Sequence, residues 1–173
     1  MIKIQIKRIN DVPFPEIIKK GEWIDLCTSE DIKLKAPQAK TLKANGNEKT
    51  RDVEFKVTYI PLGIAMKLPK GYEAIVAPRS STPKNFNIIC ANSFGIIDNS
   101  FSGNDDMWKF PAITLKNTFI KKGTRICQFR IQLSQKATIW QKIKWLFSNK
   151  IKLVEVNNLN STNRGGFGST NKE

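Results

Sequence analysis

The residue types in this 173-residue chain limit the chemistry that it can do. It has no histidine, which excludes the usual transition-metal sites and the Ser-His and Cys-His nucleophilic pairs. Its cysteines, Cys27, Cys90 and Cys127, are far apart and match no metal-ligand spacing. Acid–base chemistry must therefore come from a carboxylate, a lysine, a tyrosine or a thiol.

One carboxylate is a candidate because of its neighbours. Asp98 ends the apolar run "FGIID", is followed by the turn-forming pair Asn99 and Ser100, and has Phe101 directly behind it. Two interpretations are open: Asp98 is an ordinary turn residue, or it is a general base at a strand end that activates water. The second requires a metal ion or cationic groups to make the target electrophilic. Phe101 fits either a core position or a wall that packs on a sugar ring.

Cationic and hydroxyl side chains precede a predicted helix in the segment "PRSSTP". Thr82 is typical of a helix N-cap and Pro83 of the first helical position. Arg79, Ser80 and Ser81 would then lie at a helix N-terminus, where free N–H groups and the helix dipole favour an anion. Helix capping alone, with Arg79 in solvent, accounts for the same pattern.

Two further polar side chains occur in the strand-like run "TRICQFRI". Arg125 and Gln128 are three residues apart, so a regular strand sends them to opposite faces. Both can reach one ligand only through a bulge or across a subunit boundary. We therefore predict a structural ion pair for Arg125 and ligand binding for Gln128.

The C-terminal stretch "NSTNRGGFGSTNKE" has too few apolar residues to order itself, yet it carries one aromatic, Phe167, and Arg164 just before it. It fits a disordered end, or a single Arg-Gly-Gly element of the RNA-binding kind, although those elements work as repeats. It also fits a lid, in which Phe167 stacks on a planar ring while Ser169, Thr170 and backbone N–H groups bind phosphate.

Short strand-like runs separated by turns must position these residues. Their spacing of roughly ten residues predicts one domain with an all-β sandwich or barrel. Two segments differ. Residues 36–52 are polar, charged and without periodicity, so we predict a surface loop.

Residues 138–147 carry apolar side chains at helical spacing and predict a short amphipathic helix. We expect this helix to pack on the sandwich through its apolar positions, which are Ile139, Trp140, Ile143, Leu146 and Phe147. A basic, tryptophan-bearing helix of this kind could instead lie on a membrane or bind a partner.

The composition favours anionic partners. Lys+Arg 29 against Asp+Glu 15 gives a net charge of +14, which attracts phosphates, nucleotides, nucleic acid or an anionic membrane surface. The first residues, "MIKIQIKRIN", alternate like a strand and lack the apolar core of a signal peptide. No segment is long and apolar enough to span a bilayer. We therefore expect a reduced, cytoplasmic protein.

Taken in order, five segments resemble the five ordered motifs of the trimeric dUTP pyrophosphatases (dUTPases): "GEWIDL", "PRSS", "NSFGIIDNSFSG", "GTRICQF" and "RGGFGST". The resemblance spans Gly21 to Thr170. It implies an all-β jelly roll or distorted barrel that assembles as a homotrimer, with active sites built from more than one chain. It also implies a catalytic domain over residues 1–160 and an arm over residues 161–173 that closes the site.

The activity implied by the resemblance is Mg²⁺-dependent hydrolysis of dUTP to dUMP and pyrophosphate, a step of nucleotide metabolism. Asp98 matches the aspartate that activates the water attacking the α-phosphorus. Phe101 matches an aromatic, usually tyrosine, that packs on deoxyribose and leaves no room for a 2′-hydroxyl. Asn92 and Gly95 match substrate-binding positions of the same motif. The hairpin near Trp108 should read uracil through backbone groups.

The resemblance also assigns the phosphate and metal contacts. Arg79, Ser80, Ser81 and Gln128 match residues that bind phosphate. Asp25 matches the first-motif aspartate, which in the family holds a water on the triphosphate-bound Mg²⁺. The residues that match an arm closing over bound nucleotide are Arg164, Phe167, Ser169 and Thr170.

Two other functions compete with dUTP hydrolysis. One is dCTP deaminase, alone or bifunctional with dUTPase activity, on the same fold. It typically has an arginine where this chain has Lys84, and its deaminating carboxylate is not evident here. The other is a non-catalytic trimeric regulator that binds protein or nucleic acid. Segments 36–52 and 138–147, additions relative to a minimal family member, are candidate surfaces for a regulatory partner. Intact Asp98 and an intact arm argue against loss of catalysis.

Overall fold

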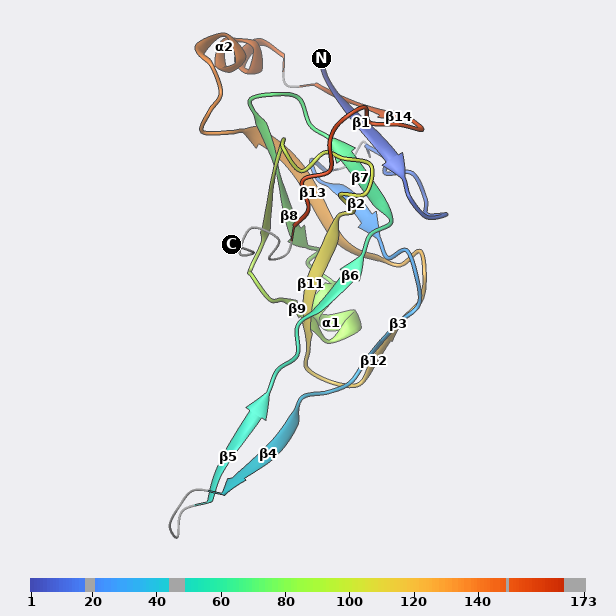
Figure 1. Ribbon diagram of the computed structural model, residues 1–173, viewed down its shortest axis with the longest axis vertical. Helices are drawn as coiled ribbons and strands as arrows, with labels where there is room; N and C mark the ends of the chain where they lie inside the picture. The colour runs from blue at the N-terminus through green and yellow to red at the C-terminus, as the bar shows by residue number, and fades with distance from the viewer. Residues whose placement is uncertain (18–20, 44–48, 149, 167–173) are drawn as a thin grey trace.

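The structure is a computed structural model that describes residues 1–17, 21–43, 49–148 and 150–166. Short strands are the main regular structure of this part of the chain (Figure 1). In chain order the elements are β1 (Ile2–Arg8), β2 (Ile24–Cys27), β3 (Ile32–Leu34), β4 (Gln38–Lys43), β5 (Lys49–Glu54), β6 (Thr58–Pro61), β7 (Ile64–Lys67), β8 (Tyr72–Pro78), α1 (Thr82–Phe86), β9 (Ile88–Cys90), β10 (Gly95–Asp98), β11 (Lys109–Thr114), β12 (Thr118–Ile120), β13 (Arg125–Leu133), α2 (Ile139–Phe147) and β14 (Ile151–Glu155).

Small sheets form the body of the molecule. A four-stranded sheet has the order β10-β8-β13-β2, and two three-stranded sheets have the orders β14-β1-β7 and β6-β11-β9. Strands β12 and β3 pair as a separate ribbon. The prediction of an all-β protein is therefore confirmed.

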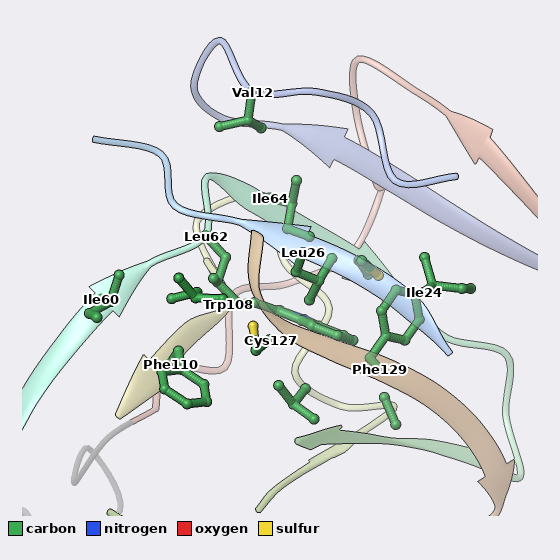
Figure 2. Close-up of a cluster of buried hydrophobic side chains, with 14 of the residues drawn as sticks. Val12, Ile24, Leu26, Ile60, Leu62, Ile64, Trp108, Phe110, Cys127 and Phe129 are labelled. Carbon is green, nitrogen blue, oxygen red and sulfur yellow. The ribbon is translucent and has the colours of Figure 1, made fainter. Parts of the chain in front are cut away.

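The core lies between these sheets and follows the alternation of the strands. In β1, Ile2, Ile4 and Ile6 are buried while Lys3 is exposed. Trp108 and Phe129 are fully buried and meet edge to face, with ring centroids 5.4 Å apart (Figure 2). Because apolar side chains fill the middle of the strands, the strand ends and turns are left to carry polar groups.

The prediction of a surface loop over residues 36–52 is wrong. Strands β4 and β5 pair antiparallel there, from Gln38↔Glu54 to Lys43↔Lys49, and form a hairpin that projects from the body (Figure 1). A two-stranded ribbon of mainly polar sequence needs no apolar face. Its sequence therefore lacks the alternation of apolar and polar residues that identifies a half-buried strand.

The helix predicted over residues 138–147 is confirmed as α2. Thr138 caps it: its hydroxyl accepts a hydrogen bond from Gln141 N, and the Gln141 side chain accepts one from Thr138 N. The expected packing is wrong, however. The apolar stripe faces outward, with Trp140 75%, Leu146 81% and Phe147 87% exposed.

The opposite side of α2 attaches the helix to the body. The Trp145 ring lies 5.7 Å from the Tyr72 ring, and Gln141 Nε2 donates a hydrogen bond to Lys70 O at 2.7 Å. Helical periodicity identifies an apolar stripe but does not say which side of the helix meets the domain. Within the described residues, no helix is long and apolar enough to cross a membrane.

The first and last strands of the domain lie side by side. β1 and β14 pair in parallel, from Ile2↔Ile151 to Ile6↔Glu155, and Val156 N donates to Ile6 O at 2.9 Å. This pairing fixes the point from which the chain runs back, over residues 157–166, toward the turn that follows β10.

Candidate active site

A pocket of about 400 Å³ opens beside β10. Its lining includes six of the residues singled out from the sequence: Asn92, Gly95, Asp98, Phe101, Trp108 and Arg164. Gly165 and Gly166 also line it, so the chain between β14 and the C-terminus closes one side of the pocket.

Asp98 ends β10 and uses its two carboxylate oxygens differently. Oδ1 accepts hydrogen bonds from the backbone N–H of Ser100 at 2.8 Å and from the Ser100 hydroxyl, which is an ordinary Asx turn. Oδ2 accepts from Arg164 Nη1 at 2.8 Å. The two interpretations of Asp98 are therefore compatible, because one oxygen makes the turn and the other faces a cation at the pocket.

The surroundings of Asp98 favour its charged form. Partial burial raises the pKa of Asp98, but hydrogen bonds from the Ser100 side chain and backbone, together with the charge and hydrogen bond of Arg164, lower it by more. The net pKa lies below the ordinary aspartate value of 3.8, so the carboxylate is ionised near neutral pH.

The aromatic wall and the arm meet at one point. A Cβ added to Gly166 would lie 2.8 Å from Cε2 of Phe101, so only glycine lets the backbone come this close to the ring. Gly95, on the opposite side, has only Val76 near the place of a Cβ, at 3.8 Å. A side chain at Gly95 would thus fill the pocket rather than collide with the protein.

Asn92 and Trp108 differ in what they leave available to a ligand. Asn92 is exposed, and its Oδ1 lies 3.1 Å from the Cys90 thiol. The Trp108 ring is buried in the core, whereas the backbone N–H of Trp108 donates to Ile64 O at 2.9 Å and its backbone carbonyl accepts from Leu62 N at 3.0 Å. Trp108 borders the pocket, but both of its backbone groups already have partners, so a base would have to bind other backbone groups of the hairpin.

A second polar cluster forms where β13 pairs with β2. Asp25 Oδ1 lies 2.9 Å from Arg79 Nε, and Asp25 Oδ2 lies 3.3 Å from Arg125 Nη1. The structural ion pair predicted for Arg125 is confirmed. Gln128 is directly opposite Asp25 in the strand pair, and the register is irregular between Arg125 and Cys127. A shift of this kind is what Arg125 and Gln128 need if both side chains are to reach one ligand.

The turn between β8 and α1 holds the predicted serines. α1 begins at Thr82 with Ser81 as its N-cap, so the capping position predicted for Thr82 is wrong by one residue. The Thr82 hydroxyl is buried and donates to Ile126 O at 2.6 Å instead of capping the helix. The Ser81 side chain makes no capping bond and Ser80 is exposed, so neither hydroxyl is committed to the helix.

The structure does not bring these two groups of residues together within one chain. β10, with Asp98, and β2, with Asp25, are the two edges of the four-stranded sheet. They are three strand spacings apart, which is about 14 Å across the sheet. Arg79 and Gln128 belong to the cluster at the β2 edge. The arm residues Phe167, Ser169 and Thr170 lie outside the described residues.

The surroundings of the cysteines disfavour their reactive thiolate forms. Burial raises the pKa of Cys27 and of Cys90, and it raises that of Cys127, which is fully buried, well above the ordinary value. None of the three is disulfide-bonded. Of the groups in the pocket, the carboxylate of Asp98 is the one that the sequence singled out as a candidate base.

One acidic residue of this site was not identified from the sequence. Asp106 is buried, with 2% of its surface exposed, and it accepts three backbone hydrogen bonds. They come from Gly103 N, Arg164 N and Gly165 N, at 2.8, 2.9 and 2.9 Å. The only signal in the sequence is the acidic pair in "GNDDMW", which is typical of any exposed turn.

Comparisons with known proteins agree with this geometry. A family model described as dUTPase matches residues 24–171. A relative 44% identical over 153 residues, covering 88% of this chain and 86% of its own, is the prophage-derived deoxyuridine 5′-triphosphate nucleotidohydrolase of Bacillus subtilis (strain 168).

Solved structures show the same fold at low sequence identity. The dUTPase of Staphylococcus bacteriophage 80alpha with dUPNHPP superposes with a TM-score of 0.58 at 16% identity, covering 96% of each chain. A mutant dUTPase from phage phi11 of S. aureus, in which a structural Mg(II) ion is coordinated, superposes with a TM-score of 0.59 at 13% identity, covering 79% of this chain and 94% of that one.

Proposed function

This chain belongs to the dUTPase family, and we propose that it hydrolyses dUTP to dUMP and pyrophosphate. The Bacillus subtilis relative is named for hydrolysis of deoxyuridine triphosphate and matches most of this chain. The observation that carries the proposal is local: one pocket unites the carboxylate of Asp98, the ring of Phe101 and the guanidinium of Arg164. The dUTPase-type fold expected from the motifs is confirmed.

Asp98 is the proposed base. A water molecule bound to its carboxylate gives up a proton to it as the water oxygen bonds to the α-phosphorus. The bond from the α-phosphorus to the bridging oxygen breaks, and pyrophosphate leaves with the electron pair. The Asx turn with Ser100 fixes the direction of the carboxylate, which is the orientation that general-base catalysis requires.

Arg164 has two possible partners in this scheme. In the free protein it pairs with Asp98, and both side chains are partly exposed, so the pair can open. A triphosphate offers the guanidinium a more highly charged partner. When Arg164 moves to the phosphates, Asp98 loses one of the causes that lower its pKa and becomes a stronger base.

Phe101 is the proposed sugar-binding wall. Its ring lines the pocket next to Gly166, so a bound deoxyribose would be enclosed between the ring and the pocket side of β10. A 2′-hydroxyl would have to fit against the same ring. We assign Asn92 and Gly95 to the substrate on the same basis, since both line this pocket. We assign Phe167, Ser169 and Thr170 to the closing arm from the motif alone.

We further propose that the complete site is shared between subunits of a homotrimer. The pocket lining includes two cations, Arg164 and Lys109, which is little charge for a triphosphate. Asp25, Arg79 and Gln128, at the far edge of the sheet, would reach the phosphates of a neighbouring chain's pocket. Large apolar side chains beside the pocket favour such a contact, since Phe94 is 50% and Ile96 59% exposed.

Mg²⁺ is the cofactor used generally in this family, and the donor set of Asp25 fits an indirect role for it. Both oxygens of Asp25 contact arginines, which leaves the carboxylate suited to hold a metal-bound water rather than the ion itself. No group of three or more acidic or cysteine side chains that could cage a metal occurs in the described residues. When bound, Mg²⁺ would neutralise triphosphate charge and help pyrophosphate to leave.

The decisive experiment is substrate profiling. Purified protein is incubated with dUTP and with each of the four standard dNTPs in the presence of Mg²⁺, and pyrophosphate release is measured. We expect release from dUTP and little from the others. Ammonia release from dCTP would instead identify a deaminase, and tight dUTP binding without turnover would identify a non-catalytic regulator.

A further inference from the structure

Asp106 is a buried carboxylate whose recorded hydrogen bonds all come from backbone N–H groups. Oδ2 accepts from Gly103 N and Arg164 N, and Oδ1 accepts from Gly165 N, all within 2.9 Å. No ion pair to Asp106 occurs in the part of the chain that the structure describes. Three backbone N–H groups from two segments thus share one buried carboxyl group, which binds the two segments together.

The two segments are distant in sequence. Asp106 and Gly103 belong to the turn between β10 and β11, whereas Arg164 and Gly165 lie near the start of the arm, residues 161–173. The contact is close: a Cβ on Gly103 would lie 2.4 Å from Asn163 Cα. Asn163 Nδ2 also donates to Asp105 Oδ2 at 2.6 Å.

Asp106 is therefore hydrogen-bonded to the backbone of Arg164, the residue whose side chain pairs with Asp98. The N–H of Arg164 is bound to Asp106 while its guanidinium is bound to Asp98. The next residue but one, Gly166, packs on Phe101. With the backbone at 164 and 165 fixed, the side chain of Arg164 starts from a fixed point beside the pocket.

We propose that Asp106 is a positioning residue that anchors the root of the arm, so that Arg164 and Gly166 are delivered to the pocket. The catalytic consequence rests on the proposed dUTP hydrolysis, while the anchoring itself does not. Without the anchor, the backbone at residues 164 and 165 would lose conformational entropy each time the arm closes. The closed state would then be less stable relative to the open state.

Asparagine is the informative replacement because it has the same shape. Asp106→Asn keeps one acceptor oxygen and replaces the other with an NH₂ donor. If the NH₂ takes the place of Oδ2, the N–H groups of Gly103 and Arg164 face another donor. If the NH₂ takes the place of Oδ1, the N–H of Gly165 faces another donor. Asp11→Asn is the matched control, since the Asp11 side chain is 95% exposed and the change in charge is the same.

The first measurement is amide hydrogen exchange, which needs no substrate. In Asp106→Asn we expect the amides of Arg164 and Gly165 to exchange roughly tenfold faster or more, as the loss of charge-assisted hydrogen bonds predicts. Asp11→Asn should leave them unchanged. Unchanged exchange in Asp106→Asn would overturn the proposal, whether or not the protein hydrolyses dUTP.

The second measurement combines Asp106→Asn with removal of the arm. In the full chain we expect kcat/KM for dUTP to fall by roughly tenfold or more. In a chain ending at residue 160, which has no arm to anchor, the same substitution should cost nothing further. An equal loss in both chains would assign Asp106 a merely structural role. An inactive wild-type protein would refute the proposed function but not the anchor.

Gly103→Ala tests the same contact if Asp106→Asn does not fold. The added methyl would collide with the Asn163 backbone, and Gly103 is not among the residues that line the pocket. We expect faster exchange at residues 164 and 165, and an activity loss that vanishes in the chain ending at residue 160. A Gly103→Ala protein with native exchange and activity would contradict the proposal.

Discussion

Arg164 Nη1 lies 2.8 Å from Asp98 Oδ2, so the start of the arm contacts a carboxylate 66 residues earlier in the chain. The proposed base is thus hydrogen-bonded to the cation that we propose to bind phosphate. If Arg164 binds the triphosphate as we propose, substrate binding separates the pair, because the triphosphate and Asp98 then compete for the same guanidinium.

Asp98→Asn should abolish turnover and leave nucleotide binding nearly intact. The amide keeps the shape of the side chain but cannot take a proton from water, and the loss of a general base costs about a hundredfold to ten thousandfold in rate. Pyrophosphate release and equilibrium binding of a non-hydrolysable dUTP analogue measure the two effects. A variant with near-normal turnover would remove Asp98 from its assigned role.

The pH dependence of activity should report the ion pair. The pKa of Asp98 is lowered in the folded protein, so its ionised form stabilises the fold above the unfolded pKa, and this contribution is lost as the pH falls through the folded pKa. The same ionisation supplies the base, so kcat/KM should stay high through the ordinary aspartate range. Arg164→Gln removes one cause of the lowering and should move the acid limb to higher pH. An unmoved limb would show that Arg164 does not act on Asp98.

Mixing two inactive variants should restore activity if sites are shared. Asp98→Asn removes the proposed base from the pocket of its own chain, and Arg79→Ala removes a proposed phosphate-binding cation from the cluster at the β2 edge. In randomly mixed homotrimers with sites between neighbours, about a quarter of the sites combine one intact Asp98 with one intact Arg79. Activity after co-refolding, with sedimentation to verify the trimer, measures this. Two variants that stay inactive in a mixed trimer would place each site within one chain.

The ring of Phe101 should control discrimination against ribonucleotides. Phe101→Ala opens space where a 2′-hydroxyl would otherwise meet the ring, so kcat/KM for UTP relative to dUTP should rise by about tenfold or more. Phe101→Tyr, which keeps the ring, is the control and should preserve the preference. A constant ratio in Phe101→Ala would mean that the ring does not select the sugar.

The two sides of α2 should respond differently to substitution. Phe147→Ser removes a side chain that is 87% exposed and should change the free energy of unfolding by no more than about 0.5 kcal/mol. Trp145→Ala removes the ring that packs on Tyr72 and should cost about 1–3 kcal/mol. Thermal and urea unfolding measure both. A large loss in Phe147→Ser would mean that the apolar stripe is covered in the assembled protein.

Local patterns predicted what is local in this structure. The run that ends at Asp98, the helix over residues 139–147 and the inward side of β1 all follow from periodicity and turn chemistry over a few residues. The ordered motifs added the family and its candidate residues. Asp106 could not be found in this way, because two of its three partners, Arg164 and Gly165, lie 58 and 59 residues later and bind through backbone atoms that carry no sequence signal. The side of α2 that faces the domain depends on Lys70 and Tyr72, which lie 71 and 73 residues before their partners Gln141 and Trp145.

The parallel pairing of β1 with β14 has a consequence for how this protein is made. Ile2 meets Ile151, so β14, the second neighbour of β1, is synthesised 149 residues after it. Contacts of such high sequence separation form slowly, and until then one edge of β1 is free to pair with other nascent chains. Chaperone protection during translation, or a low growth temperature, should therefore raise the yield of folded protein more than any change near the pocket.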